Sequence, residues 1–226
     1  MPNDSALLLA LQHGDSLFPS GGSSFSWGLE PAHRDGLVRG AADVTAFVRA
    51  QICGRFQPFD RPLLCAAHAG ADDAGLLRRL DDTAEAMTLA AELREGSRKA
   101  GAALLTIHTR LATAGAGDVY EAVRAGRMHG HLPVVQGVVW RGVGLDADAA
   151  SALALHGLVA GILGAALRLS LVGHAVAQSV RLALQPEMQL ALAQTPCGVE
   201  DVSSFAPLAE IAAMRHPDQT MRLFAT

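Results

Sequence analysis

The sequence predicts an all-α fold, in which a single domain forms a helical bundle around buried apolar central helices. Apolar residues recur at helical spacing along most of the 226 residues. Half of the residues are apolar but only 4% are aromatic, which favours an interior of alanine, leucine and valine. No internal repeat and no low-complexity linker divides the chain. We therefore expect one domain over residues 1–226.

Acidic residues and prolines mark the predicted helix starts in the first half of the chain. Asp43 precedes VTAFVRAQI, and Asp60 precedes RPLL, which places Pro62 in a first turn. A long helix is predicted further on because six apolar residues share one of its faces: Leu89, Leu93, Ala100, Leu104, Ile107 and Leu111.

The surface of that long helix is predicted to carry its own ion pairs. Glu92 and Glu95 lie near Arg94 and Arg98 in sequence. At spacings of three and four residues, such side chains are neighbours on a helix. We therefore interpret these four residues as paired with one another.

The stretch PVVQGVVWRGV, residues 133–143, is rich in β-branched residues and is compatible with a short, isolated strand. It runs into GVGLDA, residues 142–147, which has the spacing of a dinucleotide-binding turn. Asp146 and Asp148 would occupy the anion site at the start of the following helix. We interpret Asp146 as a helix cap.

Two helical segments follow, over residues 149–170 and 173–194, and Pro186 is expected to kink or end the second. Residues 195–207 have the composition of a loop. The stretch 149–167 contains no Asp, Glu, Lys or Arg, and its length reaches the lower range for a membrane-spanning helix. With His156 in its middle and no second such segment, we interpret it as a buried helix. A membrane-associated helical protein stays an alternative.

Charge and cysteine content restrict the functional class. A formal net charge of −4 offers no electrostatic basis for binding nucleic acid. Cys53, Cys65 and Cys197 form an odd, widely spaced set without a CxxC pair, which fits a reducing cytoplasm. The first residues lack the basic region of a signal peptide. We expect a cytoplasmic protein.

The stretch FPSGGSSFSWGLE, residues 18–30, concentrates serine and glycine. Neither Ser24 nor Ser26 has the G-x-S-x-G frame of a nucleophile elbow. Lys99 is the only lysine, and it lacks the frame of a phosphate-binding loop. We predict no catalytic residue, and a serine-dependent small-molecule hydrolase stays an alternative.

No metal site is predicted. His129 and His131 are the only closely spaced histidines, and they are weak candidates because no third ligand has suitable spacing. No intrinsic cofactor is expected.

The C-terminal segment carries Leu223 and Phe224 between Arg215 and Arg222. A frayed end is one interpretation. An aliphatic–aromatic pair flanked by arginines is also typical of a docking segment, and the residues leave both open.

Three separated stretches resemble the urease accessory protein F family. Residues 18–30 are similar to its L-P-x-G-G-[FY]-S-x-S-x-G-L-E. Glu92-Leu93-Arg94-Glu95, with Arg98 and Gly101, is similar to its R-E-x-x-R-x-x-G helix. The last residues are similar to its R-H-x-x-Q-x-S-R-L-F-R-S, and Leu167-Arg168-Leu169 with Gly173 and Gln178 adds support.

The sequence departs from the family pattern at several positions. Ser23 stands where an aromatic residue is usual, Leu171 where proline is frequent, and His174 where glutamine is common. In the tail, Thr220 and Ala225 replace the usual aromatic residue and the last arginine.

The resemblance implies a non-enzymatic helper in urease maturation. Such proteins bind urease accessory protein D (also called H) and recruit the GTPase accessory protein G to apo-urease, and nickel and GTP are handled by that complex. A homodimer is possible, and neither nucleic acid nor membrane is expected as a partner. Residues 207–226 would form a docking tail that orders on partner contact.

The resemblance implies roles for the residues of the matching motifs. The expected partner-binding residues are Ser24, Ser26, Glu30, Arg94, Arg98, Arg215, His216, Gln219, Arg222, Leu223 and Phe224. The expected structural residues are Pro19, Gly21, Gly22, Gly28, Gly101, Arg168, Gly173 and Gln178.

Overall fold

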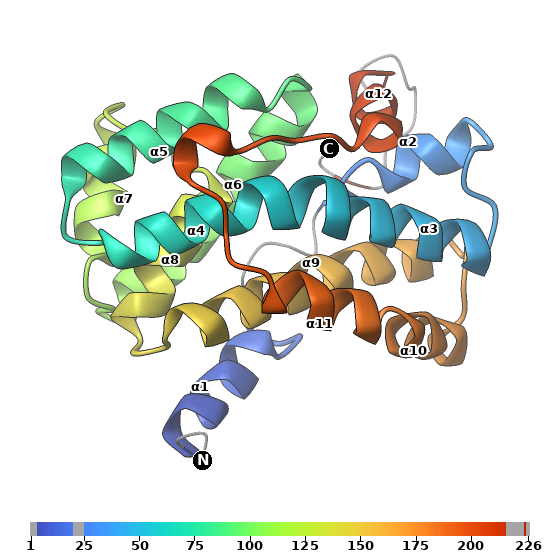
Figure 1. Cartoon of the computed structure of the whole chain (residues 1–226), viewed down its shortest axis with the longest axis horizontal. Helices are drawn as coiled ribbons and strands as arrows, with labels where there is room; N and C mark the ends of the chain where they lie inside the picture. The colour runs from blue at the N-terminus through green and yellow to red at the C-terminus, as the bar shows by residue number, and fades with distance from the viewer. Residues whose placement is uncertain (1–3, 20–24, 216–223, 225–226) are drawn as a thin grey trace.

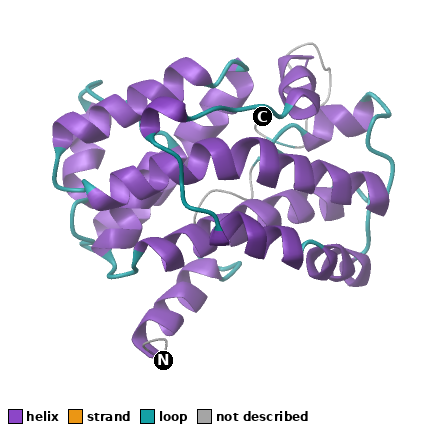
Figure 2. Cartoon of the chain, in the orientation of Figure 1, coloured by secondary structure: helices purple, strands orange, loops and turns teal. Residues whose placement is uncertain are grey.

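The computed structural model describes residues 4–19, 25–215 and 224. These residues form helices and loops without a strand (Figure 2), so the all-α prediction is confirmed. The helices in chain order are α1 (Asp4–Gly14), α2 (Leu29–Arg34), α3 (Ala41–Gln51), the π-helix η2 (Ile52–Asp60), α4 (Arg61–Ala69), α5 (Ala74–Met87), α6 (Ala91–Arg110), α7 (Ala116–Arg124), α8 (Leu132–Gly142), α9 (Ala147–Arg168), α10 (His174–Ala183), α11 (Gln185–Ala193), the 3-10 turn η3 (Val199–Asp201) and α12 (Pro207–Arg215).

The centre of the bundle is the packing of α4 on α8, with α6 and α9 against α8 (Figure 1). Gly137 permits the close approach of α4 and α8, because a Cβ there would lie 2.5 Å from the carbonyl oxygen of Leu64. Val134, Val135, Val138 and Val139 of α8 are all buried.

The stretch that is compatible with a strand by composition is therefore α8, and the strand interpretation is wrong. Pro133 lies in the first turn of this helix, where its missing N–H and fixed φ are tolerated. The valines find their apolar partners on neighbouring helices, so tertiary packing overrides the β preference of the sequence.

As the sequence predicts, α4 begins at Arg61, directly after Asp60, with Pro62 in its first turn. The interpretation of Asp60 as a helix cap is wrong, because α3, η2 and α4 follow one another without a break. Asp60 has helical backbone angles and makes no capping hydrogen bond. Its carboxylate instead lies 3.3 Å from Nε of Arg55. Similarly, α3 begins at Ala41, so Asp43 lies inside its first turn.

The helix α9 begins as the sequence predicts. The side chain of Asp146 accepts a hydrogen bond of 2.8 Å from the backbone N–H of Ala149. Among the described helices, α9 alone is long and apolar enough to cross a membrane, and more than half of its apolar window is buried in the bundle. Contacts with α1, α4, α8, α10 and α11 make it a core helix.

Pro186 begins a helix rather than kinking one. The second predicted helical segment divides at Leu184 into α10 and α11, and Pro186 stands in the first turn of α11. The chain then crosses α4 as a loop that contains only the short η3 (Figure 1). Arg61 anchors this crossing by donating to the carbonyls of Ala191, Leu192 and Gln194.

The last turn of α1 attaches that helix to the bundle. His13 is buried, and its ring centroid lies 5.2 Å from those of His108 and Trp140. The rest of α1 projects from the body (Figure 1) and exposes Leu7, Leu8 and Leu11.

Candidate protein-interaction site

The segment that leads into α2 packs beneath α12. Gly28 has φ +86°, and a Cβ there would lie 2.7 Å from the carbonyl oxygen of Ala209. Only glycine combines this left-handed backbone with so close a contact. Ser26 is buried, and its hydroxyl oxygen accepts a 3.3 Å hydrogen bond from the backbone N–H of Glu30.

Glu30 joins α2 to Phe224, the last described residue. Its carboxylate is buried, pairs with Arg34 at 2.8 Å and accepts a hydrogen bond of 3.2 Å from the backbone N–H of Phe224. The ring of Phe224 is buried beneath the guanidinium of Arg168, whose Cζ lies 4.2 Å from the ring centroid. Burial also lowers the pKa of Arg168 from its usual value. This contact gathers residues from α2, the end of α9 and the chain end.

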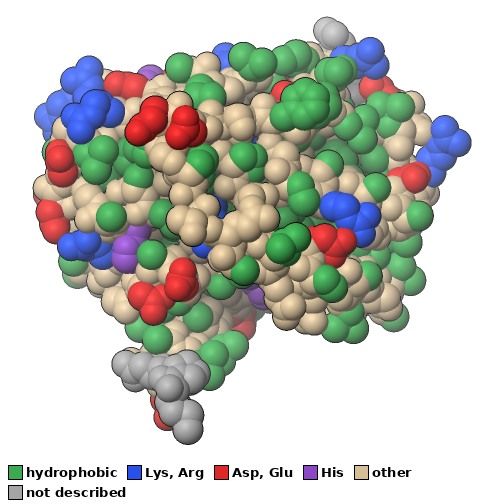
Figure 3. Space-filling view, in the orientation of Figure 1, with side chains coloured by type: hydrophobic (Ala, Val, Ile, Leu, Met, Phe, Trp, Pro, Cys, Tyr) green, Lys and Arg blue, Asp and Glu red, His purple; other side chains and the backbone are tan. Residues whose placement is uncertain are grey.

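The helix α12 presents an apolar outer face. Its inner face contacts α2 and α6 and includes Ala209, Ala212 and Ala213. The exposed residues on and beside its outer face are Leu89, Phe205, Leu208, Ile211 and Met214. Leu89 adjoins α12 because Ala90 and Leu93 form a buried cluster with Ala213. We call these five residues the α12 face. Apolar side chains are visible along the upper edge of the molecule, where α12 lies (Figure 3).

Beside the α12 face, Glu85 of α5 forms ion pairs with two arginines of α6. Arg94 Nε lies 3.4 Å from one Glu85 oxygen, and Arg98 Nη1 lies 3.4 Å from the other. Arg94 also donates to the carbonyls of Thr88 and Leu89, at 2.7 and 2.9 Å. Although burial opposes it, the hydrogen bond from His131 and the charge of Arg98 lower the pKa of Glu85.

The predicted pairing within α6 is therefore only partly right. The hydrogen bond from Lys99, with a contribution from the charge of Arg98, lowers the pKa of Glu95. The ion-pair partner of Arg94 and Arg98, however, is Glu85. Arg94 and Arg98 reach the preceding helix instead, and Glu95 pairs with Lys99 at 2.7 Å. The turn between α5 and α6 brings Glu85 closer to the arginines than sequence spacing indicates.

The loop before α8 is fixed by a buried carboxylate. Asp81 of α5 is fully buried and accepts hydrogen bonds from the backbone N–H groups of Gly130 and His131, at 2.9 and 2.8 Å, and from that of His129. Gly101 of α6 permits this packing, because a Cβ there would lie 2.0 Å from the carbonyl oxygen of Gly130.

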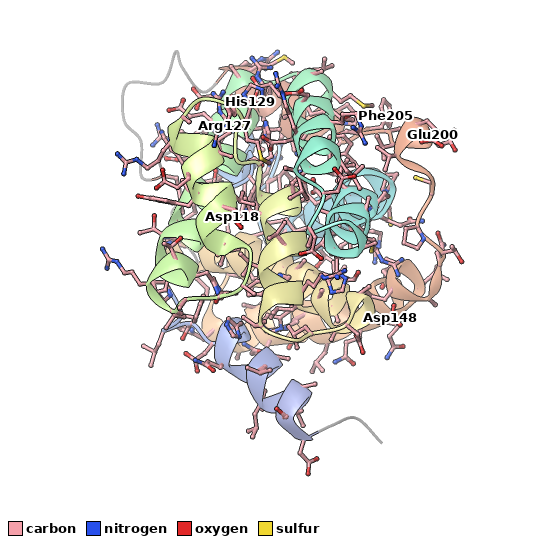
Figure 4. The ribbon with its side chains drawn as sticks, turned by 90° about the vertical axis from the view of Figure 1, so that its left-hand side faces the viewer. Asp118, Arg127, His129, Asp148, Glu200 and Phe205 are labelled. Atoms are coloured by element: carbon pink, nitrogen blue, oxygen red, sulfur yellow. The ribbon has the colours of Figure 1, made fainter. Side chains whose placement is uncertain are left out.

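This loop determines the environment of the two weak metal candidates. His131 is buried, bonds Glu85 at 2.8 Å and Ser97 at 3.2 Å, and has its pKa lowered by burial. His129 is partly exposed at the edge of the molecule (Figure 4), with Nε2 3.4 Å from Asp82. Within the described ranges, no group of three or more potential ligands could hold a metal ion.

Comparison with known proteins identifies the family. The profile of the UreF family matches residues 38–185. The chain belongs to the UreF family. It is 32% identical to urease accessory protein UreF of Trichodesmium erythraeum, over 98% of this chain and 97% of the relative. It is also 32% identical to UreF 1 of Brucella melitensis, over 96% and 92%, and 33% identical to UreF of Jannaschia sp., over 92% and 89%.

The UreF assignment makes this chain a urease accessory protein, and the structure brings together several residues of the matching motifs. Four of them form one chain of contacts, from Ser26 to Glu30, from Glu30 to Phe224 and from Phe224 to Arg168. Arg215 lies at the end of α12, with Nη1 3.3 Å from Asp35.

Other motif residues of this UreF chain lie apart from that contact. Arg94 and Arg98 lie around Glu85. Gly173 precedes α10, and Gln178 is exposed on that helix. Pro19 is exposed in the loop after α1. The remaining predicted residues lie outside the described part of the chain: Gly21, Gly22, Ser24, His216, Gln219, Arg222 and Leu223.

Burial changes the interpretation of two predicted contact residues in this UreF chain. Ser26 and Glu30 are both fully buried, so in this structure they support the surface above them. Similarly, residues 207–215 form a packed helix, whereas the sequence predicts that they belong to a docking tail. Whether these residues also contact a partner directly stays a prediction.

Proposed function

We propose that this chain is a non-catalytic scaffold of urease maturation. It binds urease accessory protein D (also called H), recruits the GTPase accessory protein G, and the assembly delivers nickel to apo-urease. In this proposal nickel is cargo, and GTP is hydrolysed by the partner. The proposed location is the cytoplasm, where the partners work.

The exposed α12 face is the observation that carries this proposal, and we propose it as the surface that contacts a partner. Ile211 is 52% exposed and Phe205 is 76% exposed, and a contiguous group of exposed apolar residues is typical of an interaction surface. Arginines at the rim favour the same use, and Arg94 and Arg215 lie at either side of this face.

The burial of motif residues beneath the α12 face supports the same proposal. Glu30 and Phe224 hold the chain end against α2, and Gly28 lets α12 approach closely. A surface held in place by its supporting contacts loses less conformational entropy when a partner binds. The motifs that resemble the family therefore gain a physical role as supports of the α12 face.

The two alternatives receive less support. Ser26, one of the two serines that a hydrolase would need, is buried and occupied by the N–H of Glu30. An accessible, activated hydroxyl is what nucleophilic catalysis requires. A membrane-associated protein would need α9, which is packed against seven other helices.

The proposal is tested by co-expressing the chain with accessory proteins D and G from the same source. Size-exclusion chromatography with light scattering should give a complex of defined mass. Ile211→Glu should prevent its assembly, because the carboxylate would be buried without a partner. Leu111→Glu is the matched control, since Leu111 is also 52% exposed and directly follows the last residue of α6.

The outcomes separate the parts of the proposal. No complex with wild-type protein would contradict the scaffold role. A complex that tolerates Ile211→Glu as well as Leu111→Glu would retain the scaffold role and remove the α12 face from it.

A further inference from the structure

A cavity of about 420 Å³ opens beside the last turn of α1. Its walls come from η2, α6, α8, α9 and α10, and much of its lining is apolar or aromatic, with Phe18, Phe56 and Trp140 among the residues. This volume lies in the range of small-molecule sites, which combine an apolar lining with a few convergent polar groups.

A buried donor in the wall of the cavity lacks an acceptor. Trp140 is 3% exposed, and its Nε1 has no hydrogen-bond partner within the described residues. Arg55 is 5% exposed, and its Nε lies 3.3 Å from the carboxylate of Asp60. Both groups can only donate. An unpaired buried donor costs free energy that a bound acceptor recovers.

The charges around the cavity favour an anionic acceptor. The charge of Arg55 is offset by Asp60, 3.3 Å away. Arg181 contacts the ring of His156, and burial together with Arg181 lowers the pKa of that histidine. No carboxylate of the described residues lies within 4.0 Å of Arg181. Asp15 also lines the opening, but it is exposed and accepts a hydrogen bond from the backbone of Leu17.

We propose that this cavity binds a small organic acid. The apolar body of the acid lies among Phe18, Phe56 and Trp140, and its carboxylate accepts a hydrogen bond from Nε1 of Trp140 and pairs with the guanidinium of Arg181. The proposal concerns the isolated chain and does not depend on any partner protein.

The two tryptophans of the chain report on this site directly. The sequence contains two, Trp27 and Trp140, and both line the cavity. Titration with benzoate as the probe should change the emission of both Trp27→Phe and Trp140→Phe, each of which retains one reporter. Saturation at about 0.1–1 mM is the expected range for a ligand of this size.

The variants separate the carboxylate from its apolar body. Trp140→Phe keeps the ring but loses the donor, so benzoate should bind about tenfold more weakly than to Trp27→Phe. Arg181→Met should also weaken binding, whereas Arg110→Met at the exposed end of α6 should not. Benzyl alcohol, which carries no charge, should bind about tenfold more weakly than benzoate.

Two results would overturn the proposal. One is the absence of a saturable change up to about 10 mM benzoate in protein that circular dichroism shows to be folded. The other is equal affinity for benzyl alcohol and benzoate, because the cavity would then accept apolar molecules without recognising a carboxylate.

Discussion

The backbone N–H of Phe224 donates a hydrogen bond of 3.2 Å to Oε2 of Glu30, across 194 positions of sequence. The same carboxylate is buried and pairs with Arg34. A single buried acid therefore ties Phe224 to α2, the helix that also contacts α12.

Replacing Phe224 with alanine should lower the free energy of unfolding by about 2 kcal/mol, less than in a central core because chain ends open locally. The loss arises because the ring is 5% exposed and lies under Arg168. Phe205→Ala is the matched control, since Phe205 is 76% exposed, and it should change stability by less than about 0.5 kcal/mol. Urea denaturation measures both, and equal effects would contradict the packed position of Phe224.

Replacing Gly101 with alanine should destabilise the protein by about 2 kcal/mol or more. The new Cβ would lie 2.0 Å from the carbonyl oxygen of Gly130, which is backbone and cannot rotate away. Gly164→Ala in α9, where no heavy atom lies within 4 Å, should instead stabilise by about 0.5–1 kcal/mol. Thermal denaturation of the two variants should therefore move in opposite directions, and stabilisation of both would rule out the close contact.

Replacing Asp81 with asparagine should cost about 2 kcal/mol. Asp81 accepts backbone hydrogen bonds from Gly130 and His131 through different oxygens, and an amide presents a donor in place of one oxygen. Hydrogen exchange should accelerate at the amides of Gly130 and His131. Asp82→Asn on the exposed side of α5 provides the comparison, and equal exchange rates in the two variants would contradict the role of Asp81.

The stability of the protein should fall as the pH drops from 6.5 to 5. Burial, with a contribution from neighbouring His13, lowers the pKa of His108 from 6.5 to about 4. The unfolded chain therefore binds this proton in a range where the folded protein does not. The free energy of unfolding should decrease by about 2 kcal/mol over this interval.

His108→Phe keeps a ring in the cluster with His13 and Trp140 and should flatten this dependence. Part of the slope should persist, because burial also lowers the pKa of His131. Chemical denaturation at several pH values measures the difference. A slope equal to that of the wild-type protein would show that His108 does not titrate in this way.

Local pattern predicted those features of the fold that depend on local chemistry. Asp146 caps α9 because a carboxylate before an apolar run meets free backbone N–H groups whatever the rest of the chain does. The six apolar residues at helical spacing also predicted α6, although Leu89 and Leu111 proved to lie outside it. Helical periodicity does not reveal where the helix ends or where other helices stop burying its apolar face.

The errors arose where distant contacts decide the structure. The valines of α8 favour a strand locally, but α4 and α6 bury them as a helix. Asp60 has the sequence context of a cap, yet Arg55 takes its carboxylate. No local signal could assign Arg94 and Arg98 to Glu85, since that pairing depends on the turn between α5 and α6. The sequence does place Asp81 and Glu85 one helical turn apart on α5, but it does not say which side chains they meet.

Nickel content of urease tests the central claim most directly. Urease should be purified from cells that express it with accessory proteins D and G from the same source, with and without this chain, and its nickel measured per active site. We predict nickel-loaded urease only when the chain is present, and loss of nickel with Ile211→Glu but not with Leu111→Glu. Equal nickel content with and without the chain would contradict its role as a scaffold for nickel delivery.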